Sequence, residues 1–292
     1  MASQSSDESG RQDDPPKADP YLIWYHPDLD FPQSVPLRKS YVIASSYRSG
    51  STFLCSELWK TGVLGAPAEY LNTDQASAVI TTAREPGRMM GRLQVSTPED
   101  YFAKLLACRT SRNGIFGMKA HYHHFEPALA WYPSMLKVLA PTTYIYINRR
   151  DKVAQAVSMA KAMQTHAWLS FDQITGRTLR YDSDFVAQCS EELERQRLGW
   201  WRWFETNNVT PFVVTYEDLL ADTAAVVRSI VELLGAENDE PERVSLPVVE
   251  RQADEINAEW MARFGRETKR EDSWAADAKT IDTDSWTSIS DP

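Results

Sequence analysis

Residues 41–54 read YVIASSYRSGSTFL and decide the fold, because an apolar run leads directly into a glycine set between small hydroxyl residues. This order is typical of a buried strand, a phosphate-binding loop and the first turn of a helix. In the nucleotide-binding pattern G-x-x-x-x-G-K-[ST], Gly50 and Thr52 fit, but Ser51 replaces the lysine that reaches the β- and γ-phosphates. The backbone N–H groups that bind an oxyanion remain. The loop therefore predicts a phosphate-like anion site without triphosphate chemistry, although a plain helix cap and turn fits the same residues.

The surrounding sequence indicates an α/β fold with a central parallel sheet flanked by helices. Four short runs rich in β-branched and aromatic residues are typical of buried strands, at residues 41–46, 114–121, 143–148 and 211–216. Helical patterns follow three of them, at residues 51–62, 151–168 and 217–235, and a further helix is expected to begin near Ser183. Strand–helix alternation of this kind predicts a parallel sheet, which binds ligands at the carboxyl ends of its strands.

Two of these helices carry a predicted buried face. In the helix at 151–168 the apolar positions with helical spacing are Val153, Val157, Ala160 and Met163. The stretch GWWRWF at 199–204 ends the helix that begins near Ser183. Its Trp200 and Trp203 fall on one face and are expected in the core, whereas Trp201 could also lie in a ligand pocket, since indole rings bind sugars and cations.

Charge and composition limit the class of protein. The net charge is −10 over 292 residues, which disfavours binding along nucleic acid or an anionic membrane. We expect residues 1–20 to be a disordered acidic tail, residues 21–265 to form the domain and residues 266–292 to be a polar extension. The N-terminus has no apolar core of a signal peptide, and no run approaches the roughly 20 apolar residues of a membrane span. These features predict a cytoplasmic protein without a membrane span.

Cysteine and histidine usage gives little sign of a metal site. The three cysteines are far apart in the sequence, which is typical of buried thiols in a reducing compartment. His121, His123 and His124 lie within four residues, but no cysteine or carboxylate spacing accompanies them. We therefore expect no bound metal.

A second anion site is indicated at the end of the run at 143–148. Arg149 and Arg150 follow this predicted strand, and Ser158 lies eight residues after Arg150 on the next helix. A guanidinium group and a hydroxyl could hold a phosphate there, although paired arginines also occur simply as solvated strand ends. Two anion sites at successive strand ends predict a ligand with phosphates on both sides of a nucleoside.

On these residues the sequence resembles the sulfotransferases that use 3′-phosphoadenosine 5′-phosphosulfate, abbreviated PAPS. The resemblance implies a P-loop-like sulfotransferase fold and a 5′-phosphosulfate held by RSGST, that is, by Arg48, Ser49, Gly50, Ser51 and Thr52. It further implies a 3′-phosphate held by Arg150 and Ser158, and an adenine held by Tyr216 and Phe53. The sequence is most similar to the bacterial trehalose 2-sulfotransferase family, from about residue 40 to 265. That likeness adds Arg251, in ERQAD, to the donor site and implies a homodimer.

The resemblance implies in-line transfer of a sulfonyl group to a hydroxyl or amine of a small-molecule acceptor. Arg48 and the loop N–H groups, with Ser51 and Thr52, would stabilise the charge that develops on the leaving phosphate, and Lys119 is a further candidate catalytic residue. Two residues compete for the role of base. Glu69 matches the glutamate of the trehalose enzymes, and His121 matches the catalytic histidine of the cytosolic sulfotransferases. An unperturbed imidazole suits proton transfer near pH 7 better than an unperturbed carboxylate.

The acceptor and two rival functions stay open at this level. A sugar, a lipid, a polyketide alcohol or an alkaloid nitrogen are all compatible with the motifs. A small-molecule kinase would require the missing lysine and a magnesium carboxylate, and a non-catalytic nucleotide-binding protein would bind the nucleotide without turnover.

Overall fold

The computed structural model describes residues 24–72, 89–168, 179–242, 244, 246, 248, 249 and 255–267. The predicted tail at 1–20, most of the predicted extension at 266–292 and Arg251 lie outside the described residues. Four parallel strands form one sheet in the order β2-β1-β3-β4. They span Lys39–Ser45 (β1), Ile115–His121 (β2), Thr142–Asn148 (β3) and Phe212–Thr215 (β4). The strand predictions and the α/β fold class are therefore confirmed.

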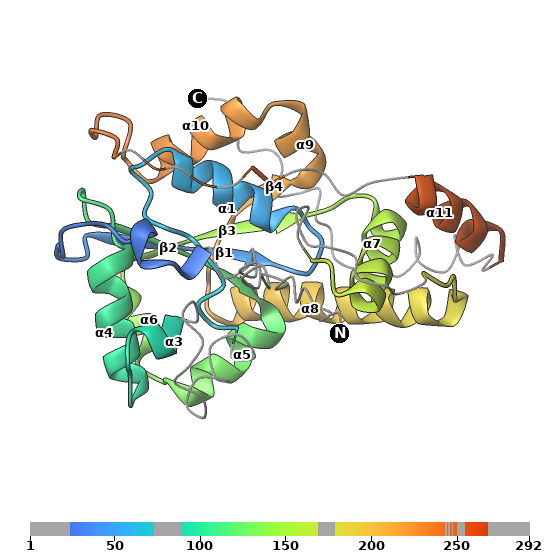
Figure 1. Cartoon of the computed structure of the whole chain (residues 1–292), viewed down its shortest axis with the longest axis horizontal. Coiled ribbons are helices and arrows are strands. Elements are labelled where there is room, and N and C mark those ends of the chain that lie inside the picture. The colour runs from blue at the N-terminus through green and yellow to red at the C-terminus, as the bar shows by residue number, and fades with distance from the viewer. Residues whose placement is uncertain are drawn as a thin grey trace, which may run out of the picture.

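Helices cover both faces of the sheet (Figure 1). One face carries α1 (Ser51–Lys60), α9 (Tyr216–Ala221) and α10 (Thr223–Leu233). The other carries α4 (Pro98–Arg109), α5 (Tyr122–Trp131), α6 (Met135–Leu139) and α8 (Ser183–Thr206). The short α3 (Met89–Arg92) lies near α4, and α7 (Lys152–Thr165) and α11 (Glu255–Glu267) lie beyond the carboxyl ends of the strands. A short 3₁₀ helix, Pro27–Leu29, precedes β1.

The alternation of side chains along β1 separates two apolar cores. Tyr41 and Ile43 point to the α1 and α10 side, where they pack with Leu54, Leu58 and Ile230. Val42 and Ala44 point to the opposite side, where the aromatic residues Phe116, Phe125, Tyr146, Trp200 and Phe204 belong to the same core. Because both faces of β1 are covered, its sequence is continuously apolar rather than alternating.

Helix α8 supplies the aromatic centre of the second core. Trp200 is fully buried, and its indole N–H donates to the Ser45 carbonyl at 2.9 Å. Trp203 packs against Phe125, with ring centroids 5.1 Å apart. The prediction of a core role is confirmed for Trp200, whereas Trp203 and Trp201 are both half-buried and pack against this core.

Two helix predictions were wrong in detail. The helix predicted at 217–235 is broken at Asp222, whose side chain accepts from the Ala225 N–H and caps α10, because an aspartate at an N-cap competes with helix continuation. In α7, Val157 and Ala160 are fully buried as predicted, but Val153 and Met163 are exposed. The buried face of α7 is instead widened by small and polar residues, among them Ala154, Gln155, Ala156 and Ser158.

The cysteines are free thiols and do not form disulfides with one another. Cys55 and Cys189 are buried and Cys108 is half-buried. Burial raises the pKa of the Cys55 thiol to about 12, so that it remains protonated. Among the described residues, no helix is long and apolar enough to cross a membrane.

Candidate active site

The loop between β1 and α1 has the geometry of an anion cradle. Gly50 caps α1 at φ 85°, and Arg48 also has a left-handed φ of 58°, which is uncommon for a residue with a side chain. The first N–H groups of α1 have no carbonyl four residues earlier in the helix, so they are available to an anion. A Cβ on Gly50 would lie 2.4 Å from Cδ2 of Tyr216, so only glycine permits this tyrosine to pack on the loop. The structure thus brings Tyr216 to the predicted phosphosulfate loop.

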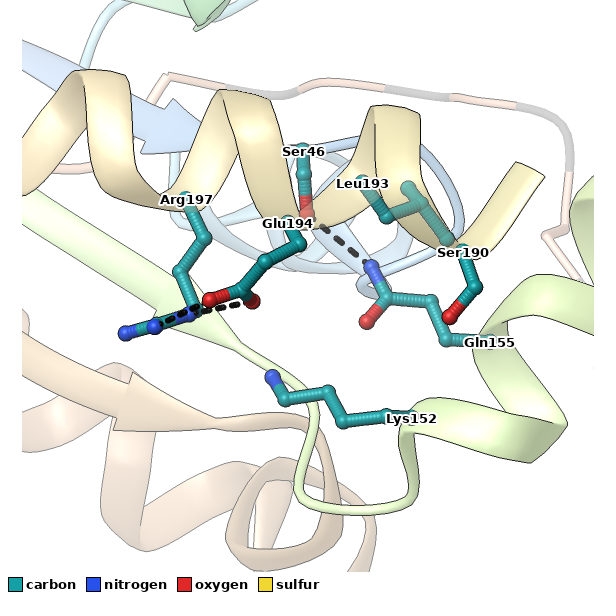
Figure 2. A pocket seen from close by; sticks show the side chains of 7 residues that line it. All are labelled: Ser46, Lys152, Gln155, Ser190, Leu193, Glu194 and Arg197. Carbon is teal, nitrogen blue, oxygen red and sulfur yellow. Dashed lines mark hydrogen bonds and ion pairs between the residues drawn. The ribbon is translucent and has the colours of Figure 1, made fainter. Parts of the chain in front are cut away.

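Gln155 of helix α7 holds the start of this loop by two hydrogen bonds. The Gln155 side-chain amide donates to Ser46 Oγ at 3.0 Å and to the Tyr47 carbonyl at 2.7 Å. Figure 2 shows Gln155 and Ser46 in a small cavity between α7 and α8, together with Lys152 and the Glu194–Arg197 ion pair. The cavity of about 10 Å³ has room for roughly one water molecule, so it is too small for a substrate. Burial, and then Arg197, lower the pKa of Lys152 to about 8.

Glu69 reaches the site because the segment after α1 runs along the open edge of β2. The Lys119 N–H donates to the Ala68 carbonyl at 2.9 Å, and the Ala66 N–H donates to the Arg109 carbonyl at 3.2 Å. Gly65 allows this approach, since a Cβ there would lie 2.7 Å from the Ile115 carbonyl oxygen. Segment and strand together hold the Glu69 side chain over the carboxyl end of β2.

At this point Glu69, Lys119 and His121 form a buried polar cluster beside the loop. Lys119 Nζ lies 2.5 Å from Glu69 Oε1 and donates to Thr52 Oγ1 at 2.8 Å. His121 Nε2 lies 3.5 Å from the same carboxylate oxygen, and Asn72 donates to Glu69 Oε2 at 2.9 Å. The structure therefore brings both predicted base candidates and the predicted lysine together at the first turn of α1.

The charge state of Glu69 follows from these neighbours. Burial alone raises the pKa of Glu69, but the charges of Lys119 and His121 and their hydrogen bonds outweigh it, so the pKa lies well below its usual range. Glu69 is an ionised carboxylate at neutral pH, and Lys119 compensates its charge.

The second predicted anion site is arranged differently from the expectation. Ser158 Oγ accepts from Arg48 Nε at 2.9 Å, so Ser158 lies at the side chain of the loop arginine. Arg150 is exposed and forms an ion pair with Asp218 at 2.8 Å. Arg149 packs over the Tyr216 ring at 4.7 Å and donates to the Arg48 carbonyl at 3.4 Å.

The other residues predicted to hold the donor lie in or beside the loop. Phe53 is half-buried against the core beside α1. Ser49, buried, donates to the Ser46 carbonyl at 2.9 Å, and Ser51 is the first residue of α1.

Sequence reasoning missed four residues of this site. Asn72 donates to Glu69, and Gln155 donates to Ser46 in the loop. Ser45 and Tyr47 belong to residues 41–54, the stretch quoted at the start of the sequence analysis. Ser45 Oγ lies 3.0 Å from His121 Nδ1, and the Tyr47 hydroxyl lies 2.7 Å from His123 Nε2. The pairing of Ser45 with His121 could have been found from the sequence, because both residues end adjacent parallel strands.

Comparison with known proteins identifies the family. The family model for Stf0 sulphotransferases matches residues 40–267, which include the loop, Glu69, Lys119 and His121. The chain belongs to the Stf0 sulphotransferase family. This enzyme is 29% identical over 264 residues to the trehalose 2-sulfotransferase of Mycolicibacterium smegmatis, with 80% of this chain and 96% of the relative covered. It is 24% identical over 260 residues to the enzyme of that name from Mycobacterium tuberculosis, with the same coverage.

Solved structures similar to this Stf0 sulphotransferase include the sulfotransferase from Alicyclobacillus acidocaldarius, at 15% identity and a TM-score of 0.42, covering 86% of this chain and 99% of that chain. The sulfotransferase domain from the curacin biosynthetic pathway is 18% identical with a TM-score of 0.40, covering 80% of this chain and 99% of that chain. In the described residues of this sulphotransferase, no group of three or more His, Cys, Asp or Glu side chains has the arrangement of a metal site.

Proposed function

We propose that this sulphotransferase moves the sulfonyl group of PAPS to a hydroxyl of a small-molecule acceptor. The observation that carries the proposal is the Glu69–Lys119–Thr52 connection, which joins a carboxylate to the first turn of the anion loop. The acceptor oxygen forms a bond to sulfur while the bond from sulfur to the 5′-phosphate oxygen breaks. The acceptor proton goes to a base, and the electron pair of the broken bond stays on the phosphate. We also propose that residues 21–265 form the catalytic domain and that two copies of it assemble as a homodimer.

The leaving phosphate is held by the loop. The N–H groups at the start of α1 are oriented in advance by the helix, so that they stabilise the developing charge. Lys119, beside Thr52, and the Arg48 guanidinium, which donates to Ser158 Oγ, add positive charge. The 3′-phosphate is held by Arg150 and Ser158, for which Arg150 leaves its exposed ion pair with Asp218. Such an exposed pair is worth at most about 1 kcal/mol, so this exchange is inexpensive.

Lys119 links donor binding to the basicity of Glu69. With Lys119 at 2.5 Å, the lowered pKa makes Glu69 a weak base. A bound phosphosulfate adds negative charge beside Thr52 and draws the ammonium group away from the carboxylate. The pKa of Glu69 then rises because an opposite charge has been removed and burial is less opposed. The base therefore becomes effective only when the donor is present.

Glu69 and His121 act as one proton acceptor. Ser45 Oγ donates to the Ala120 carbonyl at 3.3 Å and accepts from His121 Nδ1–H at 3.0 Å, an assignment made from geometry. Nε2 of His121 consequently faces Glu69 Oε1, at 3.5 Å. A proton taken from the acceptor comes to lie between the two groups, where Nε2–H donates to the carboxylate. Because His121 Nε2 and Glu69 Oε1 lie this close and receive the same proton, neither is the base alone.

The test is the transfer of labelled sulfate from PAPS to acceptors in a metabolite extract, followed by mass spectrometry of the product. Turnover as a function of pH in the wild type, Glu69→Gln and His121→Ala then tests the shared base. We expect both variants to lose about 10²-fold or more of kcat, the range for general base catalysis. Transfer that is equally fast in Glu69→Gln would remove this residue from the mechanism. PAPS binding without transfer to any acceptor would instead favour a non-catalytic nucleotide-binding protein.

A further inference from the structure

Five aromatic rings gather beside the proposed base, and the proposed chemistry uses only one of them. This ring cluster consists of Tyr47, His121, His123, His124 and Trp168. Tyr47 is its centre, with ring centroids 4.4 Å from His121, 4.8 Å from His123 and 5.4 Å from Trp168. The His123 and His124 centroids are 3.8 Å apart. The cluster lies where β1 and β2 end, between the anion loop and the end of β2 that carries His121, which is the edge where parallel sheets bind ligands.

The imidazoles of His123 and His124 are uncharged at neutral pH. Burial, and then the neighbouring His121, lower the pKa of His123 to about 4. Burial, followed by His123 and His121, lowers the pKa of His124 to about 3. The other charged groups that act on this pair are Glu69 and Lys119, which compensate each other, and Glu192, which is paired with Arg195 at 2.8 Å. A further basic residue beside the cluster is Arg48, whose guanidinium donates to the Trp168 carbonyl at 2.6 Å and is assigned to the phosphosulfate in the proposed function. A charged acceptor would therefore have to share this cation with the donor.

Several polar tips of the cluster are already paired within the protein. The Tyr47 hydroxyl and His123 Nε2 lie 2.7 Å apart, and His121 Nδ1 is held by Ser45. Tyr47, His123, His124 and Trp168 are each half-buried, so that part of each ring is still accessible. Such a surface recognises a ligand by stacking on ring faces rather than by several directed hydrogen bonds.

We infer that the ring cluster binds the acceptor, and that the acceptor is an uncharged aromatic alcohol whose ring stacks on the cluster while its hydroxyl reaches Glu69. This inference rests on the proposed sulfonyl transfer and names its substrate class. A sugar has hydroxyl groups around its ring and needs a matching set of polar partners. In the cluster, the Tyr47 hydroxyl and His123 Nε2 pair with each other, His121 Nδ1 pairs with Ser45, and His123 Nδ1 is buried away from a ligand. An anionic acceptor would lose its hydration and would compete with the phosphosulfate for Arg48.

The inference is tested by the rate of transfer from PAPS to three acceptors: 2-naphthol, 6-hydroxy-2-naphthoate and trehalose. The first two share a ring system and differ in charge, and the third is an uncharged sugar. We expect kcat/KM for 2-naphthol to exceed both others by about tenfold or more, which corresponds to one stacking contact at the upper end of its range. Sulfated products are identified by mass spectrometry. Faster transfer to trehalose or to the anionic naphthoate overturns the inference.

Two substitutions of His124 separate stacking from folding. His124→Ala removes a ring face and should raise KM for 2-naphthol by about tenfold. His124→Phe retains a flat ring and should restore most of the affinity. His26→Gln, at an exposed histidine far from the cluster in sequence, is the matched control and should leave KM unchanged. If His124→Ala and His124→Phe both behave as the wild type, the cluster is not the acceptor site.

Calorimetric titration with 3′-phosphoadenosine 5′-phosphate, abbreviated PAP, distinguishes this failure from failure of the proposed function. The His124 variants should bind PAP as the wild type does. PAP binding together with transfer to trehalose alone contradicts only the substrate class. Absence of both PAP binding and transfer contradicts the proposed function, and the inference then falls with it.

Discussion

The ion pair between Lys119 and Glu69 makes a sharp prediction about stability, which can be measured without knowing any substrate. Lys119→Met removes the ammonium group but retains most of the side-chain volume, leaving the Glu69 carboxylate buried. At the observed 2.5 Å and an effective dielectric constant of about 20, the attraction between the two charges is about 7 kcal/mol. Desolvation offsets part of this, and truncation of one partner of a buried pair costs about 3–5 kcal/mol. We therefore expect Tm to fall by about 10 °C.

The loss of stability in Lys119→Met should depend on pH in a defined direction. In the wild type the lowered pKa of Glu69 contributes stability that is present above the unfolded value of about 4.3 and is lost as the pH falls through the folded value. In Lys119→Met burial is less opposed, so the folded pKa of Glu69 is raised. The stability contribution is then present below the unfolded pKa and is lost as the pH rises through the folded one. The cost of the substitution should therefore be larger at pH 7.5 than at pH 5.

The assay is urea unfolding of the wild type, Lys119→Met and Lys119→Met/Glu69→Gln at both pH values. The double variant should recover at least half of the loss at pH 7.5, because it has no buried charge to leave unpaired. Lys60→Met is the matched control, since Lys60 pairs with Glu57 at 2.6 Å on the surface and should cost less than about 1 kcal/mol. The reasoning is refuted if Lys119→Met costs no more than Lys60→Met, or if the double variant is as unstable as the single one.

Two further predictions concern the loop. Arg48→Ala should lower kcat by about 10²-fold or more, the effect of losing one electrostatic donor to a developing charge, and steady-state kinetics with unchanged kcat would exclude the arginine. Gly50→Ala should cost more than about 1 kcal/mol and weaken PAP binding, because its φ is 85° and the new Cβ would lie 2.4 Å from Tyr216. Gly265→Ala, where a Cβ meets nothing within 4 Å, is the control for thermal unfolding and should not destabilise the protein.

The sheet could be predicted from the sequence because its strands are short, continuous apolar runs. β1 is buried on both faces, so its sequence is distinctive without knowledge of its neighbours. The loop could likewise be predicted, because Gly50 and the start of α1 are adjacent in the sequence. The break at Asp222 was predictable in principle, as an aspartate three residues before a helical N–H is a capping signal.

The site was less predictable, because its contacts join segments far apart in the chain. Glu69 was proposed from resemblance to a family, and its approach to Lys119 depends on the segment after α1 lying along β2. The hydrogen bond of Ser158 with Arg48 and the pairing of Arg150 with Asp218 depend on side-chain conformations and on neighbouring elements. No periodicity in the sequence encodes such partners.

The central claim is that two basic sites at neighbouring strand ends hold one adenosine nucleotide phosphorylated at both its 3′ and 5′ positions. Isothermal titration with PAP and with 5′-AMP measures the contribution of the 3′-phosphate directly. Loss of one charge-assisted contact is worth about 1.5–3 kcal/mol, so PAP should bind at least about tenfold more tightly than 5′-AMP. Equal affinity for the two nucleotides, or no affinity for PAP, would contradict the account.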